Sequence, residues 1–174
     1  MLNIFVNTWG NYNENGAEGG KWITLPMDED DLIEELENIA EAMGDNDPEY
    51  CIHDYEWDED IDGKAISEYD NIETINELCQ SLDNLSIYER KVYNAAVEYW
   101  GGNWVDPDDL DGFNLYEDIK DDYDLGYYWA VESGCYDTDK MGTLADYIDY
   151  RAFGRDIAIE ADGGFTSYGF IERV

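Results

Sequence analysis

The chain has 174 residues, of which 44 are Asp or Glu and nine are Lys or Arg, so its formal net charge is −35 at pH 7. Nucleic acids and anionic membrane surfaces repel such a polyanion, which argues against both as partners. The 15 Tyr, six Trp and five Phe exclude a disordered acidic tail, because such tails lack the apolar area that offsets the entropy of ordering.

The charge is dense enough to be compared with that of DNA. Duplex DNA carries one negative charge per roughly 1.7 Å of its axis, so a charge of −35 corresponds to roughly 60 Å of duplex. A compact chain of this length has a radius of gyration of about 16 Å and would pack its charge more densely than DNA does. An elongated chain would space it at about the density of DNA and would attract what attracts DNA.

Residues 1–66 predict a small sheet with one helix. The expected strands are residues 2–9, 21–25 and 50–57, with turn residues at 11–20. The helix starts at the acidic run 28–31, because carboxylates suit the positive end of a helix, and ends at Gly44, a C-terminal cap. The acidic run 58–63 leads out of this domain.

Residues 67–110 read as helical. A first helix is expected at 72–82, and Ser86 and Glu89 form a capping box that starts a second one. The expected buried stripe of the second helix is Tyr88, Val92, Ala95, Ala96 and Tyr99. Gly101 and Gly102 end this helix, and Asp106 before Pro107 predicts a short helical turn.

Residues 111–174 mix helix and strand. The expected helices are residues 115–122, 125–133 and 143–153, followed by a strand at 155–161, a hairpin turn at 162–164 and a returning strand at 165–173. The predicted fold class is therefore α+β, in three small domains: residues 1–66 (sheet plus helix), 67–110 (helical) and 111–174 (mixed α+β).

Cysteine usage and the termini favour a cytoplasmic protein. Cys51, Cys79 and Cys135 are an odd number at wide spacings, which is typical of reduced thiols rather than of a disulfide framework. The first nine residues lack the basic region and long apolar core of a signal peptide. No stretch approaches the roughly 20 apolar residues of a membrane span.

The acidic loop at 58–63 resembles the start of a calcium site. Asp58, Asp60, Asp62 and Gly63 fill the first positions of an EF-hand loop. Position 12 falls on Tyr69, however, and the loop follows a strand rather than a helix. A solvated acidic loop is the simpler interpretation.

A Mg²⁺-dependent nuclease is a second, less favoured alternative. Pro107 and Asp108, followed by Asp118 and Lys120, match a loose nuclease pattern. Asp118 and Lys120 fall in an expected helix, where residues two apart point in different directions. The acidic surroundings would also oppose a phosphodiester substrate.

Other chemistry is less well supported. His53 is the single histidine, and a structural role is the simplest interpretation of it. Zinc requires a second pair of Cys or His ligands, which the sequence does not offer. Adaptation to high salt also gives an acidic coat, but the large aromatic content weighs against it. We expect no catalytic residue, no metal and no cofactor.

Three strings in register carry a family resemblance. They are Tyr-Asn-Glu-Asn-Gly at 12–16, Ile-His-Asp-Tyr-Glu at 52–56 and Tyr-Ile-Asp-Tyr-Arg-Ala-Phe-Gly-Arg-Asp at 147–156. Shorter matches lie at 20–22, 25–26, 163–165 and 169–170. In these strings the chain resembles the ArdA-type antirestriction proteins over nearly its whole length. Arg151 and residues 100–113 depart from the family pattern.

The resemblance implies a cytoplasmic DNA mimic carried by mobile genetic elements. Family members are elongated, curved homodimers of three small domains that occupy the DNA-binding groove of type I restriction-modification enzymes, without catalysis. On this basis the chain is expected to bind such an enzyme and no nucleic acid or membrane. An acidic decoy or inhibitor of another basic DNA-binding protein stays open as an alternative.

The clusters of acids supply the candidate contact residues. The expected phosphate mimics are Asp58, Glu59, Asp60, Asp62, Asp106, Asp108, Asp109, Asp111, Glu117, Asp118, Asp121 and Asp122. The expected dimer interface is Tyr147, Tyr150, Phe153 and Arg155. Since an exposed ion pair contributes only about 0–1 kcal/mol, function is expected to survive single Asp→Asn changes and to fail after many.

Overall fold

A computed structural model describes residues 1–58, 60–102 and 105–174. The chain divides into two compact units, Met1–Ser86 and Ile87–Val174. Each unit combines helices with a three-stranded antiparallel sheet, which confirms the mixed α and β class. The division into three domains stays a prediction.

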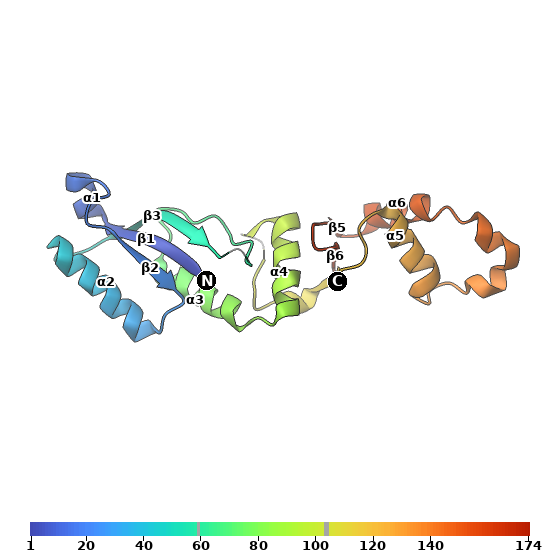
Figure 1. Cartoon of the computed structure of the whole chain (residues 1–174), viewed down its shortest axis with the longest axis horizontal. Helices are drawn as coiled ribbons and strands as arrows, with labels where there is room; N and C mark the ends of the chain where they lie inside the picture. The colour runs from blue at the N-terminus through green and yellow to red at the C-terminus, as the bar shows by residue number, and fades with distance from the viewer. Residues whose placement is uncertain (59, 103–104) are drawn as a thin grey trace. The chain divides into compact units, whose positions relative to one another are not determined.

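The first unit is built around β1, the central strand of a sheet with the order β2-β1-β3 (Figure 1). Its elements are β1 (Leu2–Thr8), α1 (Trp9–Asn15), β2 (Lys21–Leu25), α2 (Glu29–Met43), β3 (Tyr50–Trp57) and α3 (Ile72–Asn84). β2 and β3 both run antiparallel to β1. Figure 1 shows α2 running alongside this sheet.

One apolar core joins the sheet to α2 and α3. Leu2, Ile4 and Val6 are fully buried, because alternate residues of a strand face the same side of a sheet. The helical residues of this core are Leu32, Leu36, Ile39, Ile72, Ile75 and Cys79. The spacing of three and four residues places them on one face of each helix, so the opposite face of α2 is left for its acids.

The strands and long helices of this unit agree with the sequence expectation, and one segment does not. β2, β3 and the start and end of α2 lie where expected, and Gly44 ends α2 in the left-handed region with φ 70°. The segment 11–20, expected to be a turn, begins with α1 instead. The Thr8 side chain accepts a hydrogen bond from the Asn11 backbone N–H at 3.2 Å and so caps this short helix.

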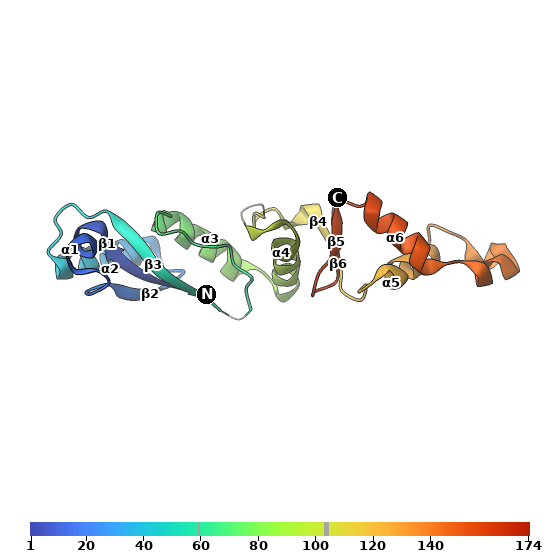
Figure 2. The same ribbon diagram turned by 90° about the horizontal axis from the view of Figure 1, so that it is seen from above.

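The second unit contains a sheet with the order β4-β6-β5, against which α4 packs. Its elements are α4 (Ile87–Trp100), η2 (Leu110–Gly112), β4 (Phe113–Tyr116), α5 (Asp122–Tyr127), η3 (Tyr128–Glu132), η4 (Thr138–Tyr147), α6 (Tyr150–Glu160), β5 (Gly163–Phe165) and β6 (Phe170–Arg173). Figure 2 shows α5 and α6 side by side within this unit. Among the described residues, no helix is long and apolar enough to cross a membrane.

The expected buried stripe of α4 is only half right. Val92, Ala95 and Ala96 are buried, but Tyr88 and Tyr99 are 52% and 46% exposed. The two tyrosines lie in the first and last turns of the helix. The stripe is therefore buried in the middle of α4 and not at its ends.

Two expectations of secondary structure in the last third were wrong. The segment 115–122, expected to be a helix, contains the end of β4 and then the turn before α5. The segment 155–161, expected to be a strand, belongs mostly to α6. Gly154, Ala158 and Ala161 have helical spacing, and the last two pack into the core of this unit. Packing of this helical face overrides the local alternation.

Two further boundaries differ from the expectation. The helix expected at 143–153 is divided between η4 and α6, because the Asp149 side chain accepts a hydrogen bond from the Ala152 N–H at 3.0 Å and starts α6 there. The hairpin expected at 162–164 turns instead between Thr166 and Gly169, whose backbones exchange hydrogen bonds. Gly163 already belongs to β5.

Candidate functional site

The helix α2 is the most densely charged element of the first unit. It carries seven carboxylates in 15 residues and no Lys or Arg. At a rise of 1.5 Å per residue this helix is about 22 Å long, which gives one carboxylate per about 3 Å. The phosphates of one DNA strand are about 3.4 Å apart along the axis, so the two charge densities are similar.

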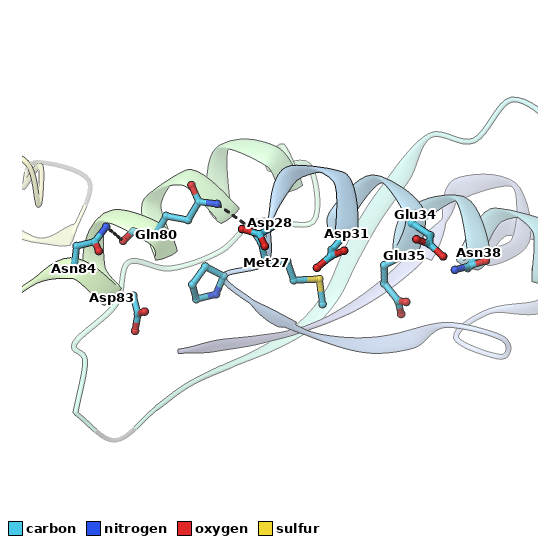
Figure 3. A pocket seen from close by; sticks show the side chains of 10 residues that line it. Met27, Asp28, Asp31, Glu34, Glu35, Asn38, Gln80, Asp83 and Asn84 are labelled. Atoms are coloured by element: carbon cyan, nitrogen blue, oxygen red, sulfur yellow. Dashed lines mark hydrogen bonds between the residues drawn. The ribbon is translucent and has the colours of Figure 1, made fainter.

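The acids of α2 continue into a groove against α3, which is shown in Figure 3. The groove has a volume of about 860 Å³. It is lined by Pro26, Met27, Asp28, Asp31, Glu34, Glu35, Asn38, Gln80, Asp83 and Asn84. The groove contains five carboxylates. One of them, Glu35, is neutralised by Lys21 at 2.5 Å.

A buried amide fixes the position of this groove. The Asn76 side chain is 4% exposed and contacts the backbone of Met27 twice: its Oδ1 accepts from the Met27 N–H at 2.8 Å, and its Nδ2 donates to the Met27 carbonyl at 2.9 Å. Gln80 donates to the same carbonyl at 2.9 Å. Met27 lies just before α2, and Asn76 and Gln80 belong to α3. These hydrogen bonds therefore fix the start of α2 against α3.

The acids expected as mimics in the first unit are exposed. Asp58, Asp60 and Asp62 face water, and Glu59 lies outside the described residues. Asp58 pairs with the Met1 amino group at 3.0 Å. In the described part of the chain, no three His, Cys, Asp or Glu side chains are grouped so that they would hold a metal ion.

All four acids expected at 106–111 are exposed: Asp106, Asp108, Asp109 and Asp111. The Asp106 carboxylate accepts a hydrogen bond from the Asp108 N–H at 3.0 Å, which stabilises the turn that follows Pro107. The turn therefore presents its acids at the surface of the second unit.

The acids expected at 117–122 are partly neutralised. Glu117 pairs with Lys91, and Asp121 pairs with Arg151 at 3.4 Å. Asp121 also caps α5. Its carboxylate accepts hydrogen bonds from the backbone N–H groups of Asp124 and Tyr123 and lies near Arg151. These contacts lower the pKa of the Asp121 carboxyl. Asp118 is exposed and Asp122 is half-buried. Lys91 and Arg151 make Glu117 and Asp121 weaker candidates than the unpaired acids of α2.

The residues expected at the dimer interface have different surroundings. Tyr147 is 84% exposed, and Arg155 is also exposed. Tyr150 is half-buried and packs edge-on against the rings of Tyr123 and Tyr127. Phe153 lines an apolar cavity of about 170 Å³ together with Ala130, Tyr136, Thr138, Met141 and Ile148.

Sequence reasoning did not select the acids of α2. They are Glu29, Asp30, Asp31, Glu34, Glu35, Glu37 and Glu41. The signal was present, because a surface helix that is rich in acids and lacks Lys and Arg forgoes the i,i+4 pairs that stabilise such helices. Glu41 in the last turn also opposes the helix dipole. Such a helix is arranged for charge rather than for stability.

A comparison with models of protein families places this geometry in context. A family model described as antirestriction protein (ArdA) matches residues 4–172. No match was found among curated proteins.

Proposed function

Because the chain belongs to the ArdA family of antirestriction proteins, we propose that it acts as a DNA mimic. In this proposal its carboxylates take the place of DNA phosphates in the DNA-binding groove of a type I restriction-modification enzyme. The groove is then blocked, and incoming DNA escapes cleavage without any catalysis by the mimic.

The observation that carries the proposal is the charge of α2. Its carboxylates occur about as often along the helix axis as phosphates along one DNA strand. The nine Lys and Arg residues of the chain can neutralise at most nine of its 44 acids. Most of the charge is therefore available to a basic partner.

The driving force follows from the same charge. Lys and Arg in a DNA-binding groove hold anions, and the mimic holds cations; both are released when the surfaces meet, as they are when DNA binds. Binding is therefore expected to be fast and to weaken steeply with salt. No single exposed carboxylate dominates, because each exposed pair is worth about 0–1 kcal/mol.

The remaining expectations belong to the same proposal. The acids expected at 58–62, 106–111 and 117–122 extend the mimic surface beyond α2. Tyr147, Tyr150, Phe153 and Arg155 contribute to a homodimer contact between two chains, each of three small domains. The protein acts in the cytoplasm and is carried by mobile genetic elements, as the family resemblance implies.

Competition with DNA tests this function directly. The protein is titrated into a complex of a type I restriction-modification enzyme with labelled duplex, and release of the duplex is followed by fluorescence anisotropy at several salt concentrations. We expect release near stoichiometric amounts at low salt. Failure to release the duplex at any ratio would exclude the proposal. Equal release from an unrelated basic DNA-binding protein would favour a general acidic decoy instead.

A further inference from the structure

Four rings of the first unit form a connected cluster, which we call the aromatic ledge. They are Trp9, Tyr12, His53 and Tyr69. The Trp9 and Tyr69 rings stack with centroids 5.4 Å apart and planes at 23°. The Tyr12 and His53 rings lie 4.1 Å apart at 30°. Trp9 meets Tyr12 edge-on at 6.0 Å and so joins the two pairs.

The ledge is open to water. Tyr69 is 74% exposed and Tyr12 is 38% exposed, while Trp9 and His53 are half-buried. A ring that keeps three quarters of its surface in water gains little from burial. The stacking of Tyr69 on Trp9 thus leaves its second face available to a ligand.

Two residues of the ledge, Trp9 and His53, are held in place by neighbouring groups. The Trp9 backbone N–H donates to the Glu49 carbonyl at 2.8 Å, and the buried Cys51 Sγ lies 3.3 Å from His53 Nε2. A binding surface that is already ordered loses little conformational entropy when a ligand arrives. Rigid aromatic side chains are efficient anchors for this reason.

Acids flank the ledge. The Tyr69 hydroxyl donates a hydrogen bond to the Glu68 carboxylate, which raises the pKa of that phenol. The Asp45 carboxylate lies beside Gly10, where its Oδ2 is 2.8 Å from the position that a Cβ would take. In the described part of the chain, no Lys or Arg lies over a ring of the ledge. Carboxylates therefore lie at the Tyr69 hydroxyl and beside the residue that follows Trp9.

We propose that the aromatic ledge binds an arginine side chain of the partner, with the guanidinium stacked on Tyr69 and bonded to a flanking carboxylate. The inference rests on the proposed function, because it takes the partner to present Lys and Arg in its DNA-binding groove. Guanidinium suits this site better than ammonium, since it is planar, weakly hydrated and able to stack while it donates to a carboxylate.

The second unit already contains such an arrangement. The Arg173 guanidinium lies 5.1 Å from the centroid of Trp100 and 5.2 Å from that of Phe113. The ledge offers the same kind of ring faces, and no Lys or Arg of the described chain lies over them. Charge and ring chemistry together point to an arginine from another chain.

Two peptides of equal charge separate stacking from simple attraction. Nona-arginine and nona-lysine, each labelled with a fluorophore, are titrated with the full chain over a range of salt concentrations. We expect nona-arginine to bind about two- to fivefold more tightly through the ledge. Tyr69→Ala should remove that preference while leaving nona-lysine binding and the salt slope unchanged. Tyr69→Phe, which keeps the ring, should retain it.

Controls keep the test decisive. Tyr88→Ala removes an exposed tyrosine of α4 and should leave the preference intact. Tyr69→Leu keeps an apolar side chain without a ring and should lose it, which covers the case in which Tyr69→Ala disturbs the fold. Equal binding of the two peptides by the parent chain would overturn the inference, as would an arginine preference that survives in Tyr69→Leu.

Competition with the restriction enzyme then separates this inference from the proposed function. If the parent chain releases the duplex and Tyr69→Ala does so equally well at every salt concentration, the ledge is not a contact and only the inference fails. If the parent chain releases no duplex but still prefers nona-arginine, the proposed function fails and the arginine site stands. If Tyr69→Ala shifts the release curve equally at low and high salt, the inference holds.

Discussion

At the scale of single residues, buried side chains and surface acids play different parts. Asn76 binds both the backbone N–H and the backbone carbonyl of Met27. Most of the acids in the groove that it positions are exposed, and an exposed ion pair contributes only about 0–1 kcal/mol. We therefore expect single changes in the core to matter more than single changes in the charged surface.

Asn76→Leu tests this difference. The change leaves the Met27 N–H without its partner in a part-buried site, and an unsatisfied buried donor costs about 1–3 kcal/mol. The free energy of unfolding, measured by urea titration, should fall by about that amount. Asn84→Ala on the same helix is the control: its amide donates only to the exposed Gln80 carbonyl, and its loss should change stability by less than about 0.5 kcal/mol. Equal losses in the two variants would contradict the role of Asn76.

The three thiols should differ in reactivity. Burial, and then the charge of Glu68, raises the pKa of Cys51 to about 11, and burial raises that of Cys79 to about 12. Cys135 is exposed. Because the thiolate is the reactive species, a disulfide reagent at pH 8 should modify one thiol at least about 100-fold faster than the others. Cys135→Ser should abolish this fast phase, and a fast phase that remained would show that Cys51 or Cys79 is accessible.

At the scale of elements, the crossing of α5 and α6 depends on two glycines. A Cβ on Gly126 would lie 1.8 Å from the Tyr150 carbonyl oxygen, and a Cβ on Gly154 would lie 1.8 Å from that of Asp122. These contacts are with backbone atoms, which cannot rotate away. The missing side chains are thus what lets the two helices approach.

Gly126→Ala and Gly154→Ala should each destabilise the second unit. Overpacking of this kind costs about 1–3 kcal/mol or more, which thermal unfolding followed by circular dichroism would detect. Gly112→Ala is the matched control, since a Cβ there meets nothing within 4 Å. A Gly126→Ala variant as stable as Gly112→Ala would contradict the close crossing.

The charge of α2 predicts a cumulative effect on inhibition. Glu29→Gln, Glu34→Gln, Glu37→Gln and Glu41→Gln together should weaken displacement of DNA from the restriction enzyme about 30-fold, if each pair contributes about 0.5 kcal/mol. The slope of log affinity against log salt should fall as well. Each single change should cost less than about fivefold.

A second quadruple variant supplies the comparison. Asp106→Asn, Asp108→Asn, Asp109→Asn and Asp111→Asn remove the same charge from a different element. If α2 is the main mimic surface, this variant should be less impaired than the α2 variant. Equal impairment would show that total charge matters and the position of the acids does not.

The sequence predicted the elements whose local signals agree with their packing. β2 and β3 have the expected bounds, and α2 ends at its predicted glycine cap. The sequence prediction was wrong where packing determines the secondary structure. The alternation at 155–161 suggested a strand, but the close approach of Gly154 to α5 favours a helix. No local pattern announces such a crossing, because its partner lies about 30 residues away in the sequence.

The candidate surface could be predicted only in part. The clustering of the acids at 106–111 makes them candidates, and all four are exposed in the structure. The neutralisation of Glu117 by Lys91 and the ring contacts of Tyr69 with Trp9 join residues far apart in the chain. Such contacts become visible only when the fold is known, so their contribution to the surface had no sequence signal.

At the scale of the whole molecule, a formal charge of −35 opposes every compact arrangement of the chain. Repulsion among surface acids is long-ranged at low ionic strength, where the Debye length is about 30 Å at 0.01 M, and short-ranged at 1 M, where it is about 3 Å. Salt therefore acts in opposite directions on the two contacts proposed for this protein. It stabilises contacts between like-charged surfaces and weakens contacts with a basic partner.

Sedimentation velocity tests this opposition. A homodimer would carry a formal charge of −70, twice that of one chain, so its apolar contact works against strong repulsion. Raising the salt concentration from about 0.05 M to 0.5 M, which shortens the screening length, should tighten the dimer, while the same change weakens displacement of DNA from the restriction enzyme. Tyr147→Asp should weaken the dimer at both concentrations, since it adds a charge at a side chain that is 84% exposed. A dimer that dissociates as salt rises would mean that ion pairs, and not apolar side chains, hold the two chains together.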